Sequence, residues 1–148
     1  NIKYLCIGCG EEEKNLKKLV KQLKIEDVVI FKKNINPNLK CAFLLQSDLF
    51  IMPSVIYGKS VEGFGISFIE AAQQATASIG GKDGGAPDAI IHEETGLICD
   101  GNDLNSIYES ILKILENDKY KIYGESAKEF SKQFDWDIII KKYLKLLN

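Results

Sequence analysis

Short apolar runs alternate with amphipathic segments along the chain. The apolar runs occupy residues 4–7, 28–31 and 49–52, and Ser78-Ile79-Gly80 is a further short segment that resembles a strand. Runs of this length are typical of strands that lie in the interior of a parallel sheet. After each of the first three runs, directly or beyond a loop, comes a segment in which apolar side chains recur at helical spacing. This alternation predicts an α/β fold, a Rossmann-like parallel sheet with helices on both faces.

The apolar positions within the predicted helices also predict which side chains face the core. Helices are expected after residue 10 and from residues 36, 65, 104, 120 and 136. The segment 136–147 is amphipathic, and a helix of this composition is expected to seek a partner. The side chains expected to face inward are Leu39, Phe43 and Leu44, then Ile66, Phe68, Ile69, Ala71 and Ala72, then Ile107, Ile111, Ile114 and Leu115.

A first glycine turn, Gly8-Cys9-Gly10, follows the first predicted strand. It has the beginning of a dinucleotide-binding fingerprint, but Glu13 stands where the last glycine of that pattern would be. Three consecutive glutamates, residues 11–13, occupy the first turn of the next helix and would repel a pyrophosphate there. A Rossmann-type oxidoreductase would have to bind its cofactor at this turn despite these charges.

A second stretch, residues 61–72, joins two glycines to a helix start. Gly63 and Gly65 lack a Cβ atom, so backbone N–H groups near the helix start can approach a ligand closely. A helix N-terminus suits a phosphate, whereas the carboxylates of Glu62 and Glu70 suit hydroxyl groups on the same ligand. A sugar linked to a nucleoside diphosphate has both features. The alternative is an ordinary buried helix after a glycine turn, with both glutamates solvated.

The stretch richest in glycine, residues 80–88, follows the predicted strand 78–80. Open α/β sheets bind ligands at the carboxyl ends of their strands, so this loop is a candidate border of the site. Lys82 would supply positive charge near a sugar or diphosphate, and Gly84 and Gly85 would let the loop approach the ligand. A merely flexible turn is the alternative.

Composition narrows the possible partners. A chain of 148 residues fits one domain, and its net charge of −2 offers no basic surface for nucleic acid. All of its basic residues are lysines, so planar, bidentate phosphate binding by arginine is absent from this sequence. Cys6 and Cys9 form a C-x-x-C, but no second pair or nearby histidine completes a metal site. We therefore expect four reduced cysteines, no metal, and a surface position for His92.

The spacing Glu62-x7-Glu70, with Gly63-Phe64-Gly65 inside it, resembles the retaining GT-B glycosyltransferases of glycosyltransferase family 4. The loop at residues 80–88 and the segment 95–99, similar to a closing strand of that family, follow in the same order. The resemblance implies that Glu62 lies by the donor sugar as the catalytic residue and that Glu70 holds the ribose hydroxyls. The other donor-binding residues that it implies are Gly63, Phe64, Gly65, Ile66, Lys82, Gly84 and Gly85.

For the whole chain, the resemblance implies a nucleotide-sugar-binding, C-terminal GT-B domain over residues 1–148. An N-terminal acceptor domain and the first strand-loop of this domain would lie outside it. The implied reaction moves a sugar from a UDP- or GDP-linked donor to a glycan or lipid acceptor, without cofactor or metal, in glycolipid or surface polysaccharide synthesis. The implied location is cytoplasmic, with contact to the inner membrane through the N-terminal domain. The isolated chain is expected to be inactive. A non-catalytic nucleotide-binding domain is a further alternative.

Overall fold

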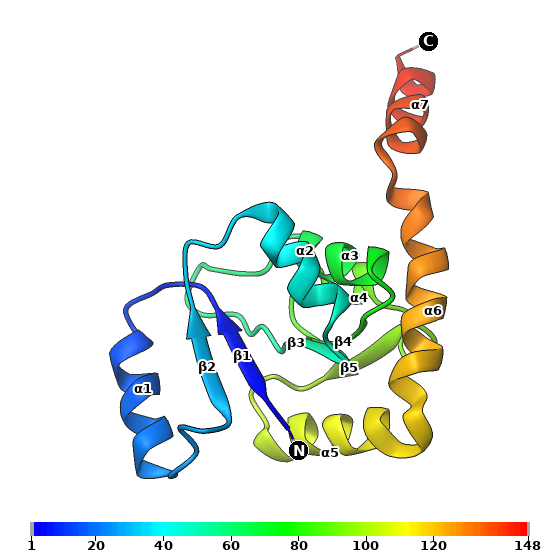
Figure 1. Ribbon diagram of the computed structural model, residues 1–148. Helices are drawn as coiled ribbons and strands as arrows, with labels where there is room; N and C mark the ends of the chain where they lie inside the picture. The colour runs from blue at the N-terminus through cyan, green and yellow to red at the C-terminus, as the bar shows by residue number, and fades with distance from the viewer. Residues whose placement is uncertain (1, 148) are drawn as a thin grey trace. The chain divides into compact units, whose positions relative to one another are not determined.

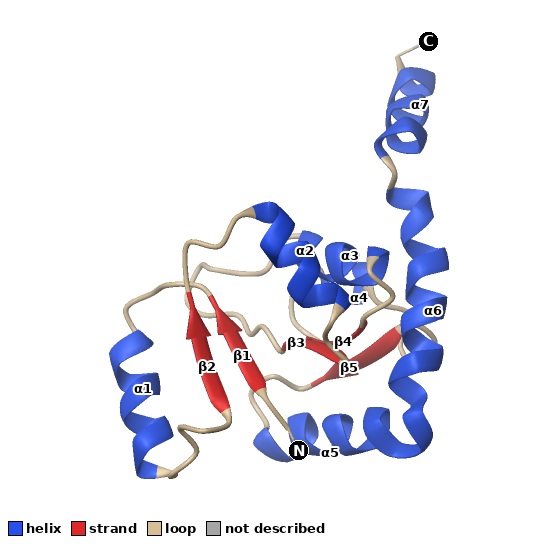
Figure 2. Cartoon of the chain, viewed as in Figure 1, coloured by secondary structure: helices blue, strands red, loops and turns tan. Residues whose placement is uncertain are grey.

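The computed structural model describes residues 2–147, and the chain divides after Lys40 into two compact units that are described separately. Parallel sheets with helices on both sides form the architecture, as the sequence predicts (Figure 2). The elements follow one another in the order strand, helix, strand over most of the chain (Figure 1). The predicted fold class is therefore confirmed.

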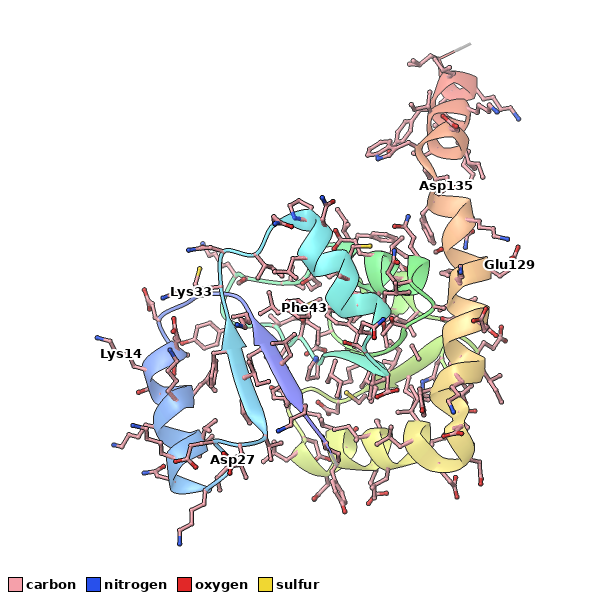
Figure 3. All side chains as sticks on the ribbon, viewed as in Figure 1. Lys14, Asp27, Lys33, Phe43, Glu129 and Asp135 are labelled. Carbon is pink, nitrogen blue, oxygen red and sulfur yellow. The ribbon has the colours of Figure 1, made fainter. Side chains whose placement is uncertain are left out.

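The first unit is a βαβ unit. Strand β1 (Tyr4–Ile7) and strand β2 (Val29–Lys32) pair in parallel, with Tyr4 opposite Val29, and α1 (Glu13–Gln22) connects them. Lys33 follows at the carboxyl end of β2 (Figure 3). Helix α2 (Pro37–Leu45) begins after Asn36, whose Oδ1 accepts the N–H of Leu39 at 2.8 Å. An asparagine at this position caps the helix, because it satisfies one of the first backbone donors.

The second unit contains a three-stranded parallel sheet in the order β3-β4-β5. Every residue of the central strand β4 is buried, which agrees with its place between two neighbours. Two single turns of 3-10 helix precede α6 and α7. The elements of this unit are β3 (Leu49–Met52), α3 (Ile66–Gln73), β4 (Ala77–Gly81), α4 (Ala86–Ala89), β5 (Gly96–Cys99), α5 (Leu104–Leu115), α6 (Lys119–Ser131) and α7 (Trp136–Leu146).

Alternation along β4 divides the core of the second unit between two faces. A Cβ atom on Gly80 would meet Phe68 of α3 and Ala86 of α4, so this face is covered by α3 and α4. Ile79, one residue earlier, packs in a cluster with Ile114 of α5, on the other face. Phe68, Ile79 and Ile114 are each no more than 1% exposed. The sheet therefore holds α3 and α4 against one face and α5 against the other.

The structure corrects several expectations about burial. Ile66 is 69% exposed because it is the first residue of α3, beyond the part of the helix that packs on the sheet. Leu115 is 37% exposed at the last turn of α5, and Leu39 is 41% exposed in α2. Strand β1 is also more exposed than expected for an interior strand, because within the described part of the first unit it pairs only with β2.

Two further predictions concern the glycine-rich loop and the last helix. Residues 80–88 do not form one loop: Gly80 and Gly81 pair within β4, and Asp88 belongs to α4, where Pro87 fits the first turn.

Helix α7 is amphipathic as expected, and most of its apolar side chains are exposed, namely Trp136, Ile138, Ile140, Tyr143, Leu144 and Leu146. None of the helices in residues 2–147 is long and apolar enough to cross a membrane.

Candidate functional site

The first turn of α3 begins at a residue that has to be glycine. Gly65 has φ of +80°, in the left-handed region, and its carbonyl accepts the N–H of Phe68 at 2.9 Å. A Cβ atom on residue 65 would lie 2.6 Å from Cδ2 of the Phe68 ring. Both the backbone conformation and the packing of Phe68 therefore favour glycine at the start of this helix. This is the helix start that the sequence singles out as the anion-binding position.

The two glycine-containing stretches predicted for the site lie against one another. The N–H of Gly85 donates to the carbonyl of Glu62 at 3.0 Å. A Cβ atom on Gly85 would lie 1.8 Å from the carbonyl oxygen of Gly63, and one on Gly84 would lie 2.5 Å from that of Glu62. No side chain larger than hydrogen fits at these contacts. The turn before α4 thus holds the backbone that leads into α3.

The side chains in the stretch leading into α3 differ in exposure. Glu62 and Glu70 are partly buried, the first before α3 and the second one turn into it. Ile66 is exposed, whereas the Phe64 ring packs against Phe134 with centroids 5.4 Å apart. The Phe64 side chain is therefore a packing group, and only its backbone remains a candidate for ligand contact. The roles of Glu62 and Glu70 toward a donor stay predictions.

Lys82 lies in the same turn and forms an ion pair that the sequence did not predict. Its Nζ lies 2.5 Å from Oδ2 of Asp100, the residue after β5. The hydrogen bond and the opposite charge raise the pKa of Lys82 and lower the pKa of Asp100. Asp100 was missed as a site residue, although an acid directly after a predicted strand, at the edge where ligands bind, was an available signal.

Glycines also allow the three strand ends to approach closely. A Cβ atom on Gly81 would lie 2.0 Å from the carbonyl oxygen of Ser54, which follows β3. One on Gly101, after β5, would lie 2.4 Å from the carbonyl oxygen of Pro53. The carboxyl ends of β3, β4 and β5 are therefore packed backbone to backbone, and the predicted site lies at this edge.

Two surface hollows lie elsewhere in the second unit, beside α6. Neither of these two hollows is lined by a predicted donor-binding residue. One, of about 340 Å³, is lined by Ser47, Asp48, Ala75, Tyr120, Lys121 and Glu125. The other, of about 430 Å³, is lined by Ile91, Glu93, Glu94, Thr95, Ile122, Tyr123, Ser126, Glu129 and Phe130.

The described residues contain no group of three or more His, Cys, Asp or Glu side chains placed to hold a metal ion. Cys6, Cys9, Cys41 and Cys99 are free thiols. His92 is exposed, and its Nδ1 accepts the N–H of Ile98 at 2.9 Å. This bond holds the turn before β5 and gives His92 a structural contact, in agreement with its expected surface position.

Comparison with known proteins identifies relatives of this chain. Residues 1–133 match the family model described as glycosyl transferases group 1. The chain is 30% identical over 140 residues to a GDP-mannose-dependent alpha-(1-6)-phosphatidylinositol monomannoside mannosyltransferase of Mycobacterium tuberculosis, covering 92% of this chain and 36% of that protein. It is 31% identical over 146 residues to N-acetyl-alpha-D-glucosaminyl L-malate synthase of Bacillus anthracis, covering 95% and 36%.

Solved structures agree with the fold. Sucrose-phosphate synthase from Thermosynechococcus elongatus superimposes with a TM-score of 0.84 at 25% identity, over 97% of this chain and 37% of that one. HepE from Anabaena, solved in complex with UDP, superimposes with a TM-score of 0.83 at 20% identity, over 99% and 40%. The chain spans about a third of the length of the curated relatives it matches. It belongs to the group 1 glycosyl transferases and has the fold of a GT-B glycosyltransferase domain.

Proposed function

We propose that this chain is the donor-binding, C-terminal half of a retaining glycosyltransferase of family 4. It binds a nucleotide diphosphate sugar at the start of α3 and supports transfer of the sugar to an acceptor hydroxyl. One observation carries the proposal: the backbone from Glu62 into α3 is held in place by the Gly84–Gly85 turn through contacts that only glycine permits. A fixed backbone of this kind is pre-organised for a ligand that binds to backbone amides.

In this proposal the start of α3 stabilises the leaving diphosphate. The first N–H groups of a helix have no partner within the helix, and the helix dipole adds positive potential there. The amides of Phe64, Gly65 and Ile66 face the phosphate oxygens, where negative charge grows as the bond to the sugar breaks. Lys82 adds a cation at the same edge. Gly63, whose Cβ position is open, leaves room for the donor. Gly84 and Gly85, packed on residues 62 and 63, border the donor with their backbone.

The two glutamates bind the ends of the donor. An ionised carboxylate only accepts hydrogen bonds, so it suits a sugar hydroxyl and repels a phosphate. Glu62, before the helix, positions the donor sugar at the reacting carbon. Glu70, one turn into α3, accepts hydrogen bonds from the ribose hydroxyls. A donor with hydroxyls on both sides of a diphosphate satisfies all of these groups at once.

The relatives indicate the range of donors and acceptors. One is named a GDP-mannose-dependent mannosyltransferase acting on a phosphatidylinositol mannoside, and HepE has been solved with UDP and with UDP-glucose. We propose a UDP- or GDP-linked hexose as donor and a glycan or lipid acceptor, in glycolipid or surface polysaccharide synthesis. An N-terminal GT-B domain of the same protein would bind the acceptor, in the cytoplasm or at the inner membrane. We expect no metal or cofactor, and no transfer by the isolated chain.

The test of this function uses the full-length protein and a panel of UDP- and GDP-linked sugars. We expect transfer with retention of the anomeric configuration, which NMR of the product reports. Glu62→Ala should lower kcat at least about 100-fold if Glu62 positions the reacting sugar. Glu70→Ala should chiefly raise the KM for the donor, and Glu109→Ala, at an exposed position of α5, is the matched control. Full transfer by both variants would instead favour a non-catalytic domain.

Binding to the first glycine turn provides a separate test of the oxidoreductase alternative. The family assignment favours glycosyl transfer, and Glu11, Glu12 and Glu13 follow that turn. In parallel titrations we expect UDP-glucose or GDP-mannose to bind and NAD to give no signal. Saturable binding of NAD alone would support the oxidoreductase interpretation.

A further inference from the structure

We propose that Asp100 is a positioning residue of the donor site: it holds the ammonium group of Lys82 at the carboxyl edge of the sheet, where that group meets the diphosphate. The proposal rests on the proposed function and adds a residue that neither the sequence pattern nor the relatives assign. It follows from how the two partners are fixed.

The backbone of Lys82 cannot shift far. Gly81, just before it, packs its Cα against the carbonyl of Ser54, and Gly85, three residues later, packs against Gly63. The N–H of Lys82 also donates to the carbonyl of Cys99 at 2.8 Å. The turn is therefore fixed at its start by two contacts and at its end by one. Only the long, flexible side chain of Lys82 remains to be oriented.

Asp100 provides that orientation because its own carboxylate is fixed. The N–H of Asp100 donates to Oγ of Ser106 on α5 at 2.9 Å. Its Oδ1 accepts the N–H of Asn102, also at 2.9 Å, which leaves Oδ2 facing Nζ of Lys82 at 2.5 Å. The position of the Asp100 carboxylate is thus fixed by Asn102 and by Ser106 of α5. The flexible side chain of Lys82 takes the conformation that reaches this carboxylate.

The ion pair leaves Lys82 able to bind a further anion. An ammonium group carries three donors, and Asp100 occupies one of them. The Lys82 side chain remains 55% exposed, so its other donors face solvent at the edge where the diphosphate is proposed to bind. The sequence contains no arginine, so within this chain a phosphate cannot be bound by a planar guanidinium group. A lysine whose ammonium group is held in one direction can make an oriented contact to the phosphate instead.

The other lysine–carboxylate pairs provide comparisons. Several join residues only three or four apart in the sequence, such as Lys17 and Glu13 on α1, and reflect local helical spacing. Lys113 and Glu93 also pair across a long stretch of sequence, between α5 and the turn before β5. That pair contains no predicted donor-binding residue. Glu93→Gln therefore removes an ion pair of the same kind without touching the proposed site.

The experiment measures the binding of UDP and GDP to the full-length protein by calorimetry, with uridine and guanosine as probes that lack the diphosphate. The variants are Asp100→Asn, Lys82→Met and the double substitution, with Glu93→Gln as control. Asparagine keeps the Oδ1 acceptor for the N–H of Asn102, so Asp100→Asn preserves the local turn while it removes the charge.

We expect Asp100→Asn to weaken binding of the preferred diphosphate about tenfold, the loss of one oriented charge-assisted contact. Lys82→Met should weaken it at least as much, and adding Asp100→Asn to Lys82→Met should have no further effect. Binding of the nucleosides should stay unchanged, and the thermal midpoint should fall by no more than about 2 °C. Glu93→Gln should bind the diphosphates and the nucleosides as the wild type does.

Three results would overturn the inference. Unchanged or tighter binding of the diphosphate by Asp100→Asn would show that the carboxylate does not orient Lys82 for the ligand. A further loss in the Lys82→Met background would show that Asp100 acts on the fold and not through Lys82. No loss on Lys82→Met would remove Lys82 from the site, while the Glu62 and Glu70 variants still test glycosyl transfer independently. Failure of the wild type to bind either diphosphate would overturn the proposed function itself.

Discussion

Two glycine turns follow parallel strands of this protein, and they differ in what surrounds them. In the first, after β1, a Cβ atom added to Gly8 or Gly10 would meet no heavy atom within 4 Å in the described part of its own unit. At the second, Cβ atoms on Gly81, the last residue of β4, and on Gly84 and Gly85 in the turn would lie 2.0, 2.5 and 1.8 Å from backbone oxygens of other segments. The first turn is open, and the second is packed against the backbone that leads into α3.

This difference supports the second glycine turn, rather than the first, as part of the proposed site. Both turns follow a strand, and both match part of a known binding pattern in the sequence. Only the second needs glycine for a tertiary contact, and that contact fixes a helix start. The first is followed by Glu11, Glu12 and Glu13, whose charges oppose an anionic ligand.

The largest effect is expected at Gly85. Gly85→Ala places a Cβ atom against the carbonyl of Gly63, so the Gly84–Gly85 turn and the start of α3 must move apart. We expect a loss of about 1–3 kcal/mol in the free energy of unfolding and loss of donor binding. Gly10→Ala, in the open turn, should change neither. Urea denaturation of the full-length protein measures the free energy of unfolding, and calorimetry measures donor binding. Equal effects of Gly85→Ala and Gly10→Ala would contradict the proposed difference between the two turns.

Substitutions around the start of α3 separate folding from ligand binding. In Gly65→Ala, the new Cβ atom would clash with the Phe68 ring, and an alanine would have to adopt the positive φ of residue 65. We therefore expect a loss of about 1 kcal/mol or more in the free energy of unfolding. Gly63→Ala has open space around it in the described chain, so stability should stay within about 0.5 kcal/mol of the wild type. We expect Gly63→Ala nevertheless to weaken donor binding, because the donor approaches the backbone there. Unchanged donor affinity would mean that the ligand lies elsewhere.

The smallest effect is expected from acid titration. Lys82 lowers the pKa of Asp100 at the second turn, and Lys17 lowers the pKa of Glu13 after the first. A carboxyl whose pKa is lowered on folding stabilises the protein above its unfolded pKa of about 4, and this contribution is lost as pH falls through the folded value.

Both of these pairs are exposed, so Asp100→Asn and Glu13→Gln should each lower the thermal midpoint at pH 7 by no more than about 2 °C. The difference from the wild type should vanish at low pH for both variants. A large, persistent difference at low pH for Asp100→Asn would show that the second turn depends on Asp100 for more than its charge.

Much of the fold followed from local sequence patterns. Apolar runs of four residues predicted β1 and β3 with the bounds that the structure has, and helical spacing predicted α5. Such elements are set by neighbouring residues, so a single sequence contains the information. The exposure of Ile66 and Leu115 was not predictable in this way, because it depends on where each helix ends over the sheet.

The site was predicted in part. The sequence identified the start of α3 and the glycine-rich stretch as candidates, but it did not show that Gly85 contacts Glu62 and Gly63. It also missed Asp100, which lies 18 residues from Lys82. Contacts of this kind arise from the order of strands in the sheet, which brings β4 and β5 side by side, and local periodicity does not encode that order.

The most direct test of the central claim is a crystal structure of the full-length protein with the nucleotide sugar that it binds. We predict diphosphate oxygens within hydrogen-bond distance of the amides at Gly65 and Ile66, with Glu70 on the ribose and Glu62 beside the sugar. A nucleotide sugar ordered at the Gly8–Gly10 turn, or with its diphosphate away from the start of α3, would contradict it.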